Sequence, residues 1–515
     1  MSLIAALLLA TAEVFLFPDP FINTSLHQIV RVSGTLRNTG PATVPAELVV
    51  ELPAGVQLAE VRGDHFKGAW TCVEKTGSVV CTNPSFAATQ SYFYDFRLRF
   101  ENGTGRVTEL PVRLRIAGEE SNQQNYRAIA RVIWRRPVRV TSSADAGPGT
   151  LRQAIHDLNA ACSGELLCEV LFELPLPATI EPLTPLPPVT ACGWRMDPSA
   201  AASKRDEDRL VTLSGARLSS GNGLELRTNC RVQVNADTFN NLGGLAIGGF
   251  PGNGISFTGS TGAYRIFLMS LGTDATGTQA RPNGGRGLVV ETPASIRLSD
   301  SIISGNTRSG VYIASDCDID AEGLFIGVGR NGEPLPNGAS GVYVGAGRFF
   351  LDQNSTVAHH PHFGVAFQRG AKGAIDASVH SNGVQAIDWD LDGPTPNRNE
   401  TFFPTRPSIT DAYFDAARNE TVIVVAAPLR NGWPFSGVRV YANRTRNASG
   451  RAEMERFLTS RVIWSQQTDG SRVEFRVSGD LRGEIITAVQ IYDPWGDASR
   501  ALMTSSEVSD GVAVR

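Results

Sequence analysis

Apolar and polar residues repeat along the middle of this chain with a step of 54 residues. Residues 301–313 and 355–367 share a strand-like triplet, a polar turn, a glycine and an apolar–x–apolar triplet, and the same step carries residues 287–290 onto 341–344. Such a repeat is typical of stacked units that bury their apolar faces only against their neighbours. The pattern predicts a solenoid, which we place at residues 165–400.

Glycines mark the expected start of each turn of this solenoid. They are Gly223, Gly254, Gly287, Gly310, Gly341, Gly364 and Gly383, at spacings between 19 and 33 residues. Turns of roughly 20–25 residues suit a parallel β-helix. The longer steps contain a loop, at residues 271–284 and 326–338, which predicts a ridge on one face.

Alternating apolar and polar residues, broken by turn sequences, fill the chain on both sides of the solenoid. Residues 30–36, 46–52 and 92–100 are clear examples. Short alternating strands separated by Gly, Pro and Asn predict antiparallel β-sandwiches. We place one at residues 24–138 and a second at residues 405–515.

Residues 139–164 have a helical rather than an alternating pattern. Thr150 precedes Leu151, Ile155 and Leu158, which fall on one face of a helix. The open end of a solenoid requires a cap. This segment therefore predicts a short capping helix.

Several stretches resemble a known family. Residues 140–155, VTSSADAGPGTLRQAI, resemble the N-terminal segment of bacterial secreted right-handed parallel β-helix proteins of the CSLREA-type class. Further likeness to immunoglobulin-like repeat modules of bacterial surface proteins is found at residues 37–40, 52–56 and 70–81, and to the sandwich after the solenoid of that class at residues 450–458, 486–488 and 493–499. The resemblance implies an all-β protein, in which a right-handed parallel β-helix of the pectin lyase-like kind is flanked by an N-terminal immunoglobulin-like β-sandwich and a C-terminal β-sandwich.

Composition and charge bear mainly on cell location. The 515-residue chain has 42% hydrophobic and 19% charged residues and a formal charge of −4, so nothing global points to nucleic acid. Residues 1–12 form a short apolar run that ends in the small–x–small sequence Ala-Thr-Ala, and we interpret residues 1–23 as a signal peptide and lead-in. We find no other segment that could cross a bilayer, and we expect a secreted or cell-surface bacterial protein.

The seven cysteines fit export to an oxidising compartment. We predict two disulfides between cysteines that are close in sequence, Cys72–Cys81 and Cys162–Cys168. Cys192 and Cys230 could pair with each other or join the second of these clusters. Cys317 alternates with charged residues in a strand-like segment, so we expect it to be a buried thiol.

Asp388, Asp390 and Asp392 form a D-x-D-x-D-G sequence. Three carboxylates and a turn are what a calcium loop requires. In the resembling class this stretch is a common exit from the solenoid, and the alternative interpretation, which we favour, is a hydrogen-bonded linker with Asx turns. No cofactor is otherwise expected, and calcium stays open.

His360 and His362 belong to a cluster of three histidines just before a turn of the solenoid. Clustered histidines can bind a transition metal or act as acid and base. The 54-residue alignment places them on the polar turn at residues 305–308. We therefore favour an exposed polar turn over a site.

Asp316, Asp318 and Asp320 alternate along one expected strand and would point outward together. Parallel β-helix lyases and hydrolases use aspartate clusters on such faces, and a calcium or acid cluster is one interpretation. The signatures of polygalacturonases and pectate lyases are not apparent in the sequence. We favour a solvated face.

Tyr312 and Tyr343 sit between apolar neighbours, so alternation turns their side chains outward. An outward aromatic row suits stacking on sugars. We therefore expect non-catalytic recognition or adhesion, with glycan binding along the solenoid face, and lean against an enzyme. The alternatives are a polysaccharide lyase or glycoside hydrolase of the parallel β-helix type, and a purely structural surface spacer.

Overall fold

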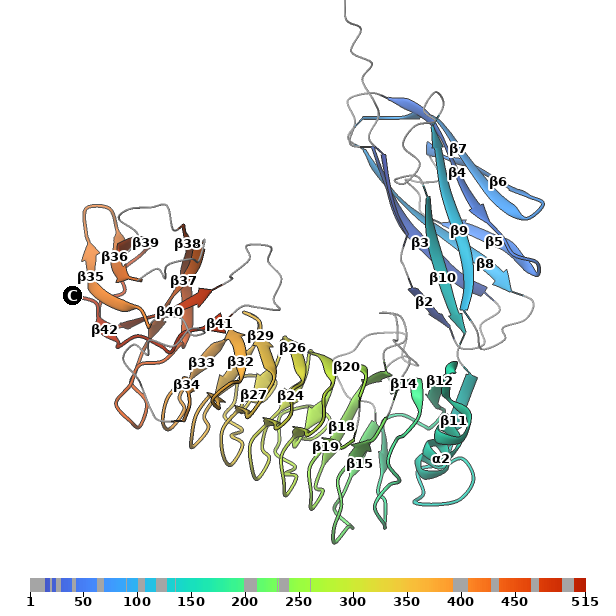
Figure 1. The fold of residues 1–515 in the computed structure, drawn as a ribbon. Helices are drawn as coiled ribbons and strands as arrows, with labels where there is room; N and C mark the ends of the chain where they lie inside the picture. Colours follow the sequence, from blue (N-terminus) through green and yellow to red (C-terminus); the bar gives the residue numbers. More distant parts are fainter. Residues whose placement is uncertain are drawn as a thin grey trace, which may run out of the picture. The chain divides into compact units, whose positions relative to one another are not determined.

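The computed structural model describes most of the chain, in two compact units that are considered separately (Figure 1). One unit comprises residues 1–138 with 161–169, and the other comprises residues 139–160 with 170–515. The described residues are 14–18, 21–24, 29–38, 43–62, 69–88, 90–100, 107–116, 127–134, 136–198, 211–228, 230, 240–259, 261–391, 406–427, 435–464, 472–492 and 504–515.

The N-terminal unit contains a sandwich of two sheets. One sheet has the order β1 (Val14–Pro18), β3 (Ile29–Asn38), β8 (Ser91–Phe100), β5 (Val56–Arg62). The other has the order β2 (Phe21–Thr24), β10 (Arg127–Trp134), β9 (Val107–Ile116), β4 (Val44–Glu51), β7 (Ser78–Phe86), β6 (Thr71–Lys75). The predicted sandwich is confirmed, but β1 and β2 join it, so its strands begin before residue 24.

The predicted alternation produces the core of this sandwich. In β8 the alternate side chains Tyr94, Phe96 and Leu98 are fully buried. Trp70 packs edge-on against Phe86, with ring centroids 5.6 Å apart. Aromatic contacts of this kind add roughly 0.5–1.5 kcal/mol beyond the area that they bury.

The solenoid is a right-handed parallel β-helix of three long sheets, as predicted (Figure 1). The nine-stranded sheet comprises β11 (Arg136–Val140), β12 (Ser163–Phe172), β14 (Cys192–Met196), β17 (Asn240–Gly243), β20 (Ala263–Phe267), β23 (Ser295–Ser299), β26 (Asp318–Glu322), β29 (Arg348–Leu351) and β32 (Lys372–Ile375). The eight-stranded sheet comprises β13 (Ala178–Ile180), β15 (Val211–Ser214), β18 (Leu245–Gly248), β21 (Ser270–Leu271), β24 (Ile302–Ile303), β27 (Phe325–Ile326), β30 (Thr356–Ala358) and β33 (Ser378–His380). The seven-stranded sheet comprises β16 (Leu224–Leu226), β19 (Ile255–Phe257), β22 (Leu288–Val290), β25 (Val311–Ile313), β28 (Val342–Val344), β31 (Val365–Phe367) and β34 (Ile387–Trp389).

Glycines start most turns because the backbones of neighbouring turns approach closely there. A Cβ atom on Gly310 would lie 2.8 Å from the carbonyl oxygen of Gly341, and one on Gly341 would lie 2.7 Å from that of Gly364. The expectation that Gly383 starts the last turn is wrong. Ala386 occupies that position, since its carbonyl accepts from Val365 N at 2.8 Å. Ala386 is tolerated because no further described turn stacks on it.

The two predicted loops, residues 271–284 and 326–338, stack on each other. Each contains a small antiparallel bridge, Thr273 with Ala280 and Val328 with Pro334. The amide of Arg330 donates to the carbonyl of Gly277 at 2.9 Å and joins the loops. The loops therefore form the expected ridge.

Helix α2 (Leu151–Ala161) follows Thr150, whose hydroxyl accepts from the Gln153 amide at 3.3 Å. Its buried residues include the predicted Leu151, Ile155 and Leu158. The N-cap satisfies a helix donor that would otherwise lack an intrahelical partner. The segment is therefore the predicted amphipathic helix, with its apolar face buried.

The C-terminal sandwich belongs to the same unit as the β-helix. One sheet comprises β35 (Ser408–Asp415), β36 (Glu420–Ala426) and β39 (Arg472–Ser478). The other comprises β38 (Arg456–Trp464), β37 (Phe435–Asn443), β40 (Ile485–Tyr492) and β41 (Thr504–Ser505), with β42 (Val512–Ala513) also paired to β40. The sandwich packs on the last turns of the β-helix: Val379 pairs with Met454, and the Trp389 indole donates to Ser505 O at 3.0 Å.

Disulfides account for six of the seven cysteines. The pairs are Cys72–Cys81, Cys162–Cys168 and Cys192–Cys230. Cys317 is free and buried, and burial raises the pKa of its thiol to about 12. In the described part of the chain, no helix is long and apolar enough to span a membrane.

Candidate functional site

The outward face of the nine-stranded sheet carries charges of both signs on neighbouring turns. Arg265, Arg297 and Asp320 are in register on three consecutive strands. Beside them, Asp318 is in register with Arg348 and forms an ion pair with it. The aspartates point outward as predicted, but arginines on neighbouring turns face them. This arrangement favours a solvated, charge-paired face.

Asp316, Asp318 and Asp320 are not arranged as a metal site. Side chains two residues apart on one strand face are separated by about 6.6 Å, whereas calcium ligands all lie within roughly 2.5 Å of the ion. Within the described ranges, no group of three or more His, Cys, Asp or Glu residues is placed to hold a metal.

A groove of about 370 Å³ lies where this face meets the C-terminal sandwich. The β-helix contributes residues from β26, β29 and β32 and the turns after them, and the sandwich contributes one residue each from β37 and β40. The lining residues are Glu322, Phe350, Leu351, Asp352, Gln353, Asn354, Ala374, Asp376, Arg439 and Ile491. The groove therefore combines carboxylates, amides, one arginine and the edge of an aromatic ring.

Three carboxylates of the groove form a column, Glu322, Asp352 and Asp376. Glu322 is the last residue of β26, and Asp352 and Asp376 hold the equivalent position directly after β29 and β32. The amides of Asp352 and Asp376 accordingly donate to Ala321 O (3.1 Å) and Leu351 O (2.8 Å). Neighbouring strands are about 4.8 Å apart, so the column repeats at that spacing.

The members of the column differ in their partners. Asp352 accepts from the Gly323 amide (2.9 Å) and the Ser355 hydroxyl (2.7 Å), which fixes its turn. Asp376 forms an ion pair with Arg439 of the sandwich. Glu322 is exposed. The column can thus accept hydrogen bonds from a hydroxyl-rich ligand.

Tyr312 and Tyr343 form a stacked pair on the seven-stranded sheet. Their ring centroids are 5.2 Å apart with an interplanar angle of 15°. Arg286 lies over Tyr312, with its Cζ atom 3.8 Å from the ring centroid, and the Tyr343 hydroxyl donates to Gln368 Oε1 at 3.3 Å. Both rings point outward and are half-buried. Because Arg286 and Tyr343 cover Tyr312, sugar stacking there is restricted to the other face of Tyr343.

His360 belongs to a buried ladder of side chains, one from each turn. The members are Asn283, Asn306, Asn337, His360 and Asn382. Asn337 Nδ2 donates to His360 Nε2 at 3.1 Å, so Nδ1 carries the proton and donates to Asn382 Oδ1 at 3.0 Å. Burial lowers the pKa of His360 to about 4.

The expectation of an exposed histidine turn is therefore wrong for His360, which is only 1% exposed. His362 is exposed, so the two side chains do not converge on a metal or a substrate. His360 is buried because amides of adjacent turns satisfy both ring nitrogens. The alignment of His360 with Asn306 contained the signal for this ladder.

The ladder ends on Glu453 of the C-terminal sandwich, a residue that the sequence did not indicate. Asn382 donates to its carboxyl group through the backbone amide (3.0 Å) and through Nδ2 (3.4 Å). Burial raises the pKa of Glu453 to about 7, although these hydrogen bonds act in the opposite direction. No periodic pattern surrounds Glu453 that could have revealed it.

Two of the three aspartates in the D-x-D-x-D-G sequence, Asp388 and Asp390, lie in the described part of the chain. Asp388 is fully buried in β34, and Asp390 has a positive φ of 69°. Asp392 lies outside the described residues. The calcium interpretation stays a prediction.

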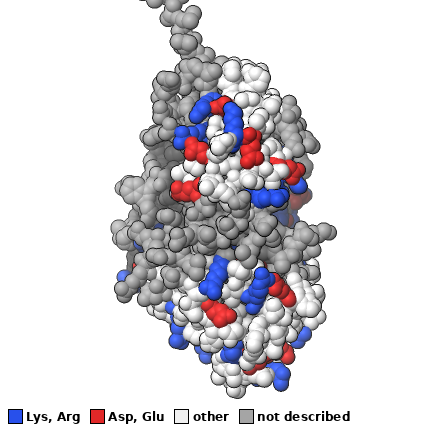
Figure 2. Space-filling view, turned by 90° about the vertical axis from the view of Figure 1, so that its right-hand side faces the viewer, with Lys and Arg blue, Asp and Glu red and all other residues white. Residues whose placement is uncertain are grey.

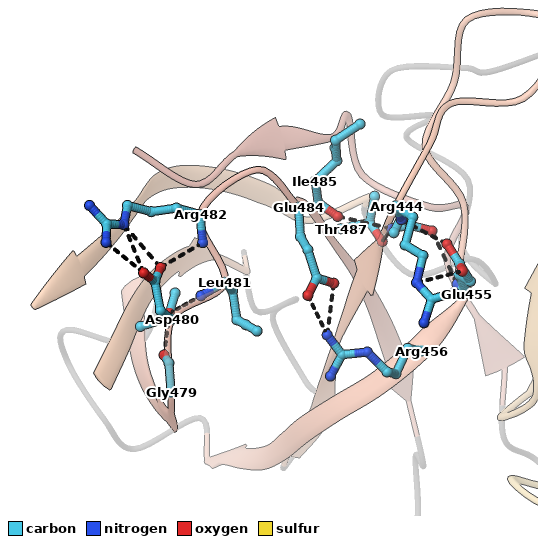
Figure 3. A network of polar contacts seen from close by, with 12 residues as sticks. Arg444, Glu455, Arg456, Gly479, Asp480, Leu481, Arg482, Glu484, Ile485 and Thr487 are labelled. Carbon is cyan, nitrogen blue, oxygen red and sulfur yellow. Dashed lines mark hydrogen bonds and ion pairs between the residues drawn. The ribbon is translucent and has the colours of Figure 1, made fainter. Parts of the chain in front are cut away.

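Ion pairs neutralise much of the charge on the C-terminal sandwich (Figure 3). Arg456 contacts both carboxylate oxygens of Glu484 at 2.7 Å, and Arg482 contacts Asp480 at 2.6 Å. Figure 2 shows basic and acidic residues interspersed on one face of the molecule. Exposed pairs contribute roughly 0–1 kcal/mol each, and we assign them no binding role.

No protein-family model and no curated protein matches the chain. A collagen-binding domain from a Staphylococcus aureus adhesin is 14% identical, covering 24% of this chain and 99% of that chain, with a TM-score of 0.19. The chitin-binding domain of a Pyrococcus furiosus chitinase is 16% identical, with coverages of 21% and 97% and a TM-score of 0.16. A mutant of Bacteroides uniformis β-glucuronidase 2 is 8% identical, with coverages of 98% and 60% and a TM-score of 0.17. At TM-scores this low, these likenesses do not indicate a function for this chain.

Proposed function

We propose that this is an extracellular protein that recognises glycans without cleaving them, along the outward face of the β-helix. The observation that carries the proposal is the groove against the C-terminal sandwich. Its volume of about 370 Å³ is in the range of small-molecule sites, and its hydrogen-bonding groups suit a ligand rich in hydroxyls. Three disulfides support an oxidising, extracellular location.

The charge of the groove suggests which glycans it prefers. Three carboxylates against one arginine, −3 + 1, give a local charge of −2. Such a groove repels polyuronates and favours neutral or amino-bearing sugars. The carboxylates recur over three consecutive turns, and Ser299 holds the equivalent position on the turn before them.

Removing two exposed ligand-facing groups of the groove should weaken binding at least tenfold. In Glu322→Gln with Gln353→Ala, a charged acceptor and an amide are lost, and a hydrogen bond to a charged group contributes about 1.5–3 kcal/mol. We would measure Kd by calorimetry with neutral and amino-bearing oligosaccharides selected on a glycan array. Glu291→Gln, an exposed carboxylate outside the groove, is the matched control. Unchanged affinity in the double variant would contradict this site.

The tyrosine pair is the proposed second contact, used only by long polymers. Tyr312→Ala with Tyr343→Ala removes the one accessible aromatic face on the seven-stranded sheet. We expect several-fold weaker binding of a polysaccharide and unchanged binding of a short oligosaccharide that fills the groove, because stacking of a sugar on one aromatic ring contributes on the order of 1 kcal/mol. Equal affinities for the polysaccharide before and after substitution would remove the tyrosines from the site.

The second candidate function is glycoside hydrolysis, and the carboxylate column favours it. Carboxyl groups of retaining glycosidases are about 5–5.5 Å apart, close to the strand spacing of about 4.8 Å. Incubation with neutral and acidic polysaccharides, with calcium or with chelator, tests this function. If the wild type released new reducing ends or unsaturated uronides and Glu322→Gln did not, catalysis rather than recognition would be the function.

A further inference from the structure

The junction between the β-helix and the C-terminal sandwich is held by hydrogen bonds from several of the last turns, including Ile375 N to Ser505 Oγ and Ser449 Oγ to Gly383 O, both at 2.6 Å. Val379 and Met454 exchange backbone hydrogen bonds of 2.9 and 2.8 Å. The Ser378 hydroxyl donates to Met454 O at 3.2 Å. Glu453 precedes Met454 in the chain, and its carboxyl group accepts from Asn382 across this junction.

Glu453 is only 3% exposed and lines a cavity of about 250 Å³. The charged and titratable groups that share this cavity are His360 and His380 from the β-helix and Arg446 and Glu455 from the sandwich. Glu455 accepts from the Arg444 amide at 2.7 Å (Figure 3). Among the described residues, amide groups donate hydrogen bonds to the Glu453 carboxyl group, and no basic side chain forms an ion pair with it.

We propose that Glu453 is a proton-operated latch that keeps the C-terminal sandwich docked on the β-helix while its carboxyl group is neutral. Ionisation places a charge in the buried junction, and docking weakens. Arg439 and Ile491 then move away from the groove, because both belong to the sandwich. This regulation of the groove rests on the proposed glycan-binding function, whereas the latch itself does not.

The direction of the pH dependence follows from linkage. The pKa of the docked carboxyl group is raised from 4.5 to about 7, mainly by burial. Docking is therefore strongest below pH 4.5 and weakens as the pH rises to about 7, by on the order of 10²-fold. Burial lowers the pKa of His380, which makes an opposite contribution that a Glu453 variant leaves intact.

Hydrogen exchange of the glycan-free, full-length protein tests the latch. Protection factors of the Val379 and Met454 amides, corrected for intrinsic exchange, should fall on the order of 10²-fold between pH 4.5 and 8. In Glu453→Gln, which mimics the neutral carboxyl group, they should no longer fall as the pH rises, and the remaining His380 contribution can only raise them. Glu455→Gln is the matched control and should behave like the wild type.

Amides of β25, in the middle of the β-helix, are the internal reference and should keep their protection. The latch is wrong if junction protection in the wild type is constant with pH, or if Glu453→Gln follows the wild type. If Glu453→Gln does not fold, the wild-type comparison of the junction with β25 decides alone.

A second arm separates the latch from glycan recognition. Affinity for the selected oligosaccharide should fall with junction protection in the wild type as the pH rises, and it should not fall in Glu453→Gln. No binding at any pH, with the exchange result as expected, would reject the proposed function and leave the latch. Constant affinity in the wild type, despite loss of junction protection, would reject the regulation of the groove.

Discussion

Asn306→Ala should lower the free energy of unfolding of the β-helix by about 3–5 kcal/mol. Asn306 is 2% exposed, and its Nδ2 donates to Leu271 O and to Asn337 Oδ1, both at 2.9 Å. Its Oδ1 accepts from Asn283 Nδ2 at 2.9 Å. In the alanine variant Leu271 O, Asn337 Oδ1 and Asn283 Nδ2 each lose this hydrogen-bond partner. Each buried group left unsatisfied costs about 1–3 kcal/mol.

Denaturant unfolding followed by circular dichroism measures this effect in the transition of the solenoid. The chain has several domains, so that transition must be separated from those of the sandwiches. Thr307→Ala is the matched control, since Thr307 is the adjacent exposed residue of the same turn and should change stability by less than about 0.5 kcal/mol. An equally small loss for Asn306→Ala would mean that the ladder does not stabilise the fold.

The fold could be predicted because its signals are local and repeated. Each turn contains a small residue at the close approach between backbones and an apolar triplet that fills the core. Two turns differ in length by the ridge loop, which explains why the 54-residue step was clearer than a single turn. The start of the last turn was predicted wrongly, because Gly383 lies only three residues before Ala386, which occupies that position in the structure.

The ladder was harder to recognise because burial of a polar side chain depends on partners from other turns. His360 reaches Asn337 and Asn382, 23 and 22 residues away. Without the alignment to other turns, three histidines around a proline suggest a solvated turn. Only their register with Asn306 shows that a hydrogen-bonding column passes through that position.

The groove could not be predicted from the sequence, because docking of the C-terminal sandwich on the β-helix completes its lining. Glu322, Asp352 and Asp376 hold equivalent positions at the ends of three consecutive strands, and that column was available in the sequence. Arg439 and Ile491 belong to strands of a separate sandwich. Which face of the β-helix those strands cover is determined by contacts such as Val379 with Met454, which no local pattern indicates.

His360→Asn should remove a loss of stability of about 3 kcal/mol on acidification. The pKa of His360 falls from 6.5 in the unfolded chain to about 4 in the fold because the ring is buried. The unfolded state therefore binds more protons between these values, and stability is complete above pH 6.5 and lost as the pH falls to 4. Protonation would also place a donor on Nε2 opposite the Asn337 donor. Asparagine does not titrate and makes this turn a copy of its neighbours.

The measurement is the difference in unfolding free energy between His360→Asn and the wild type, at pH 7.5 and at pH 4. It should move by about 3 kcal/mol in favour of the variant at the lower pH. Glu453 changes stability in the opposite direction over a similar range, but it is common to both proteins and cancels in the difference. His362→Asn, at an exposed position outside the ladder, should leave the profile unchanged. The same difference at both pH values for His360→Asn would show that His360 is not held neutral by the ladder.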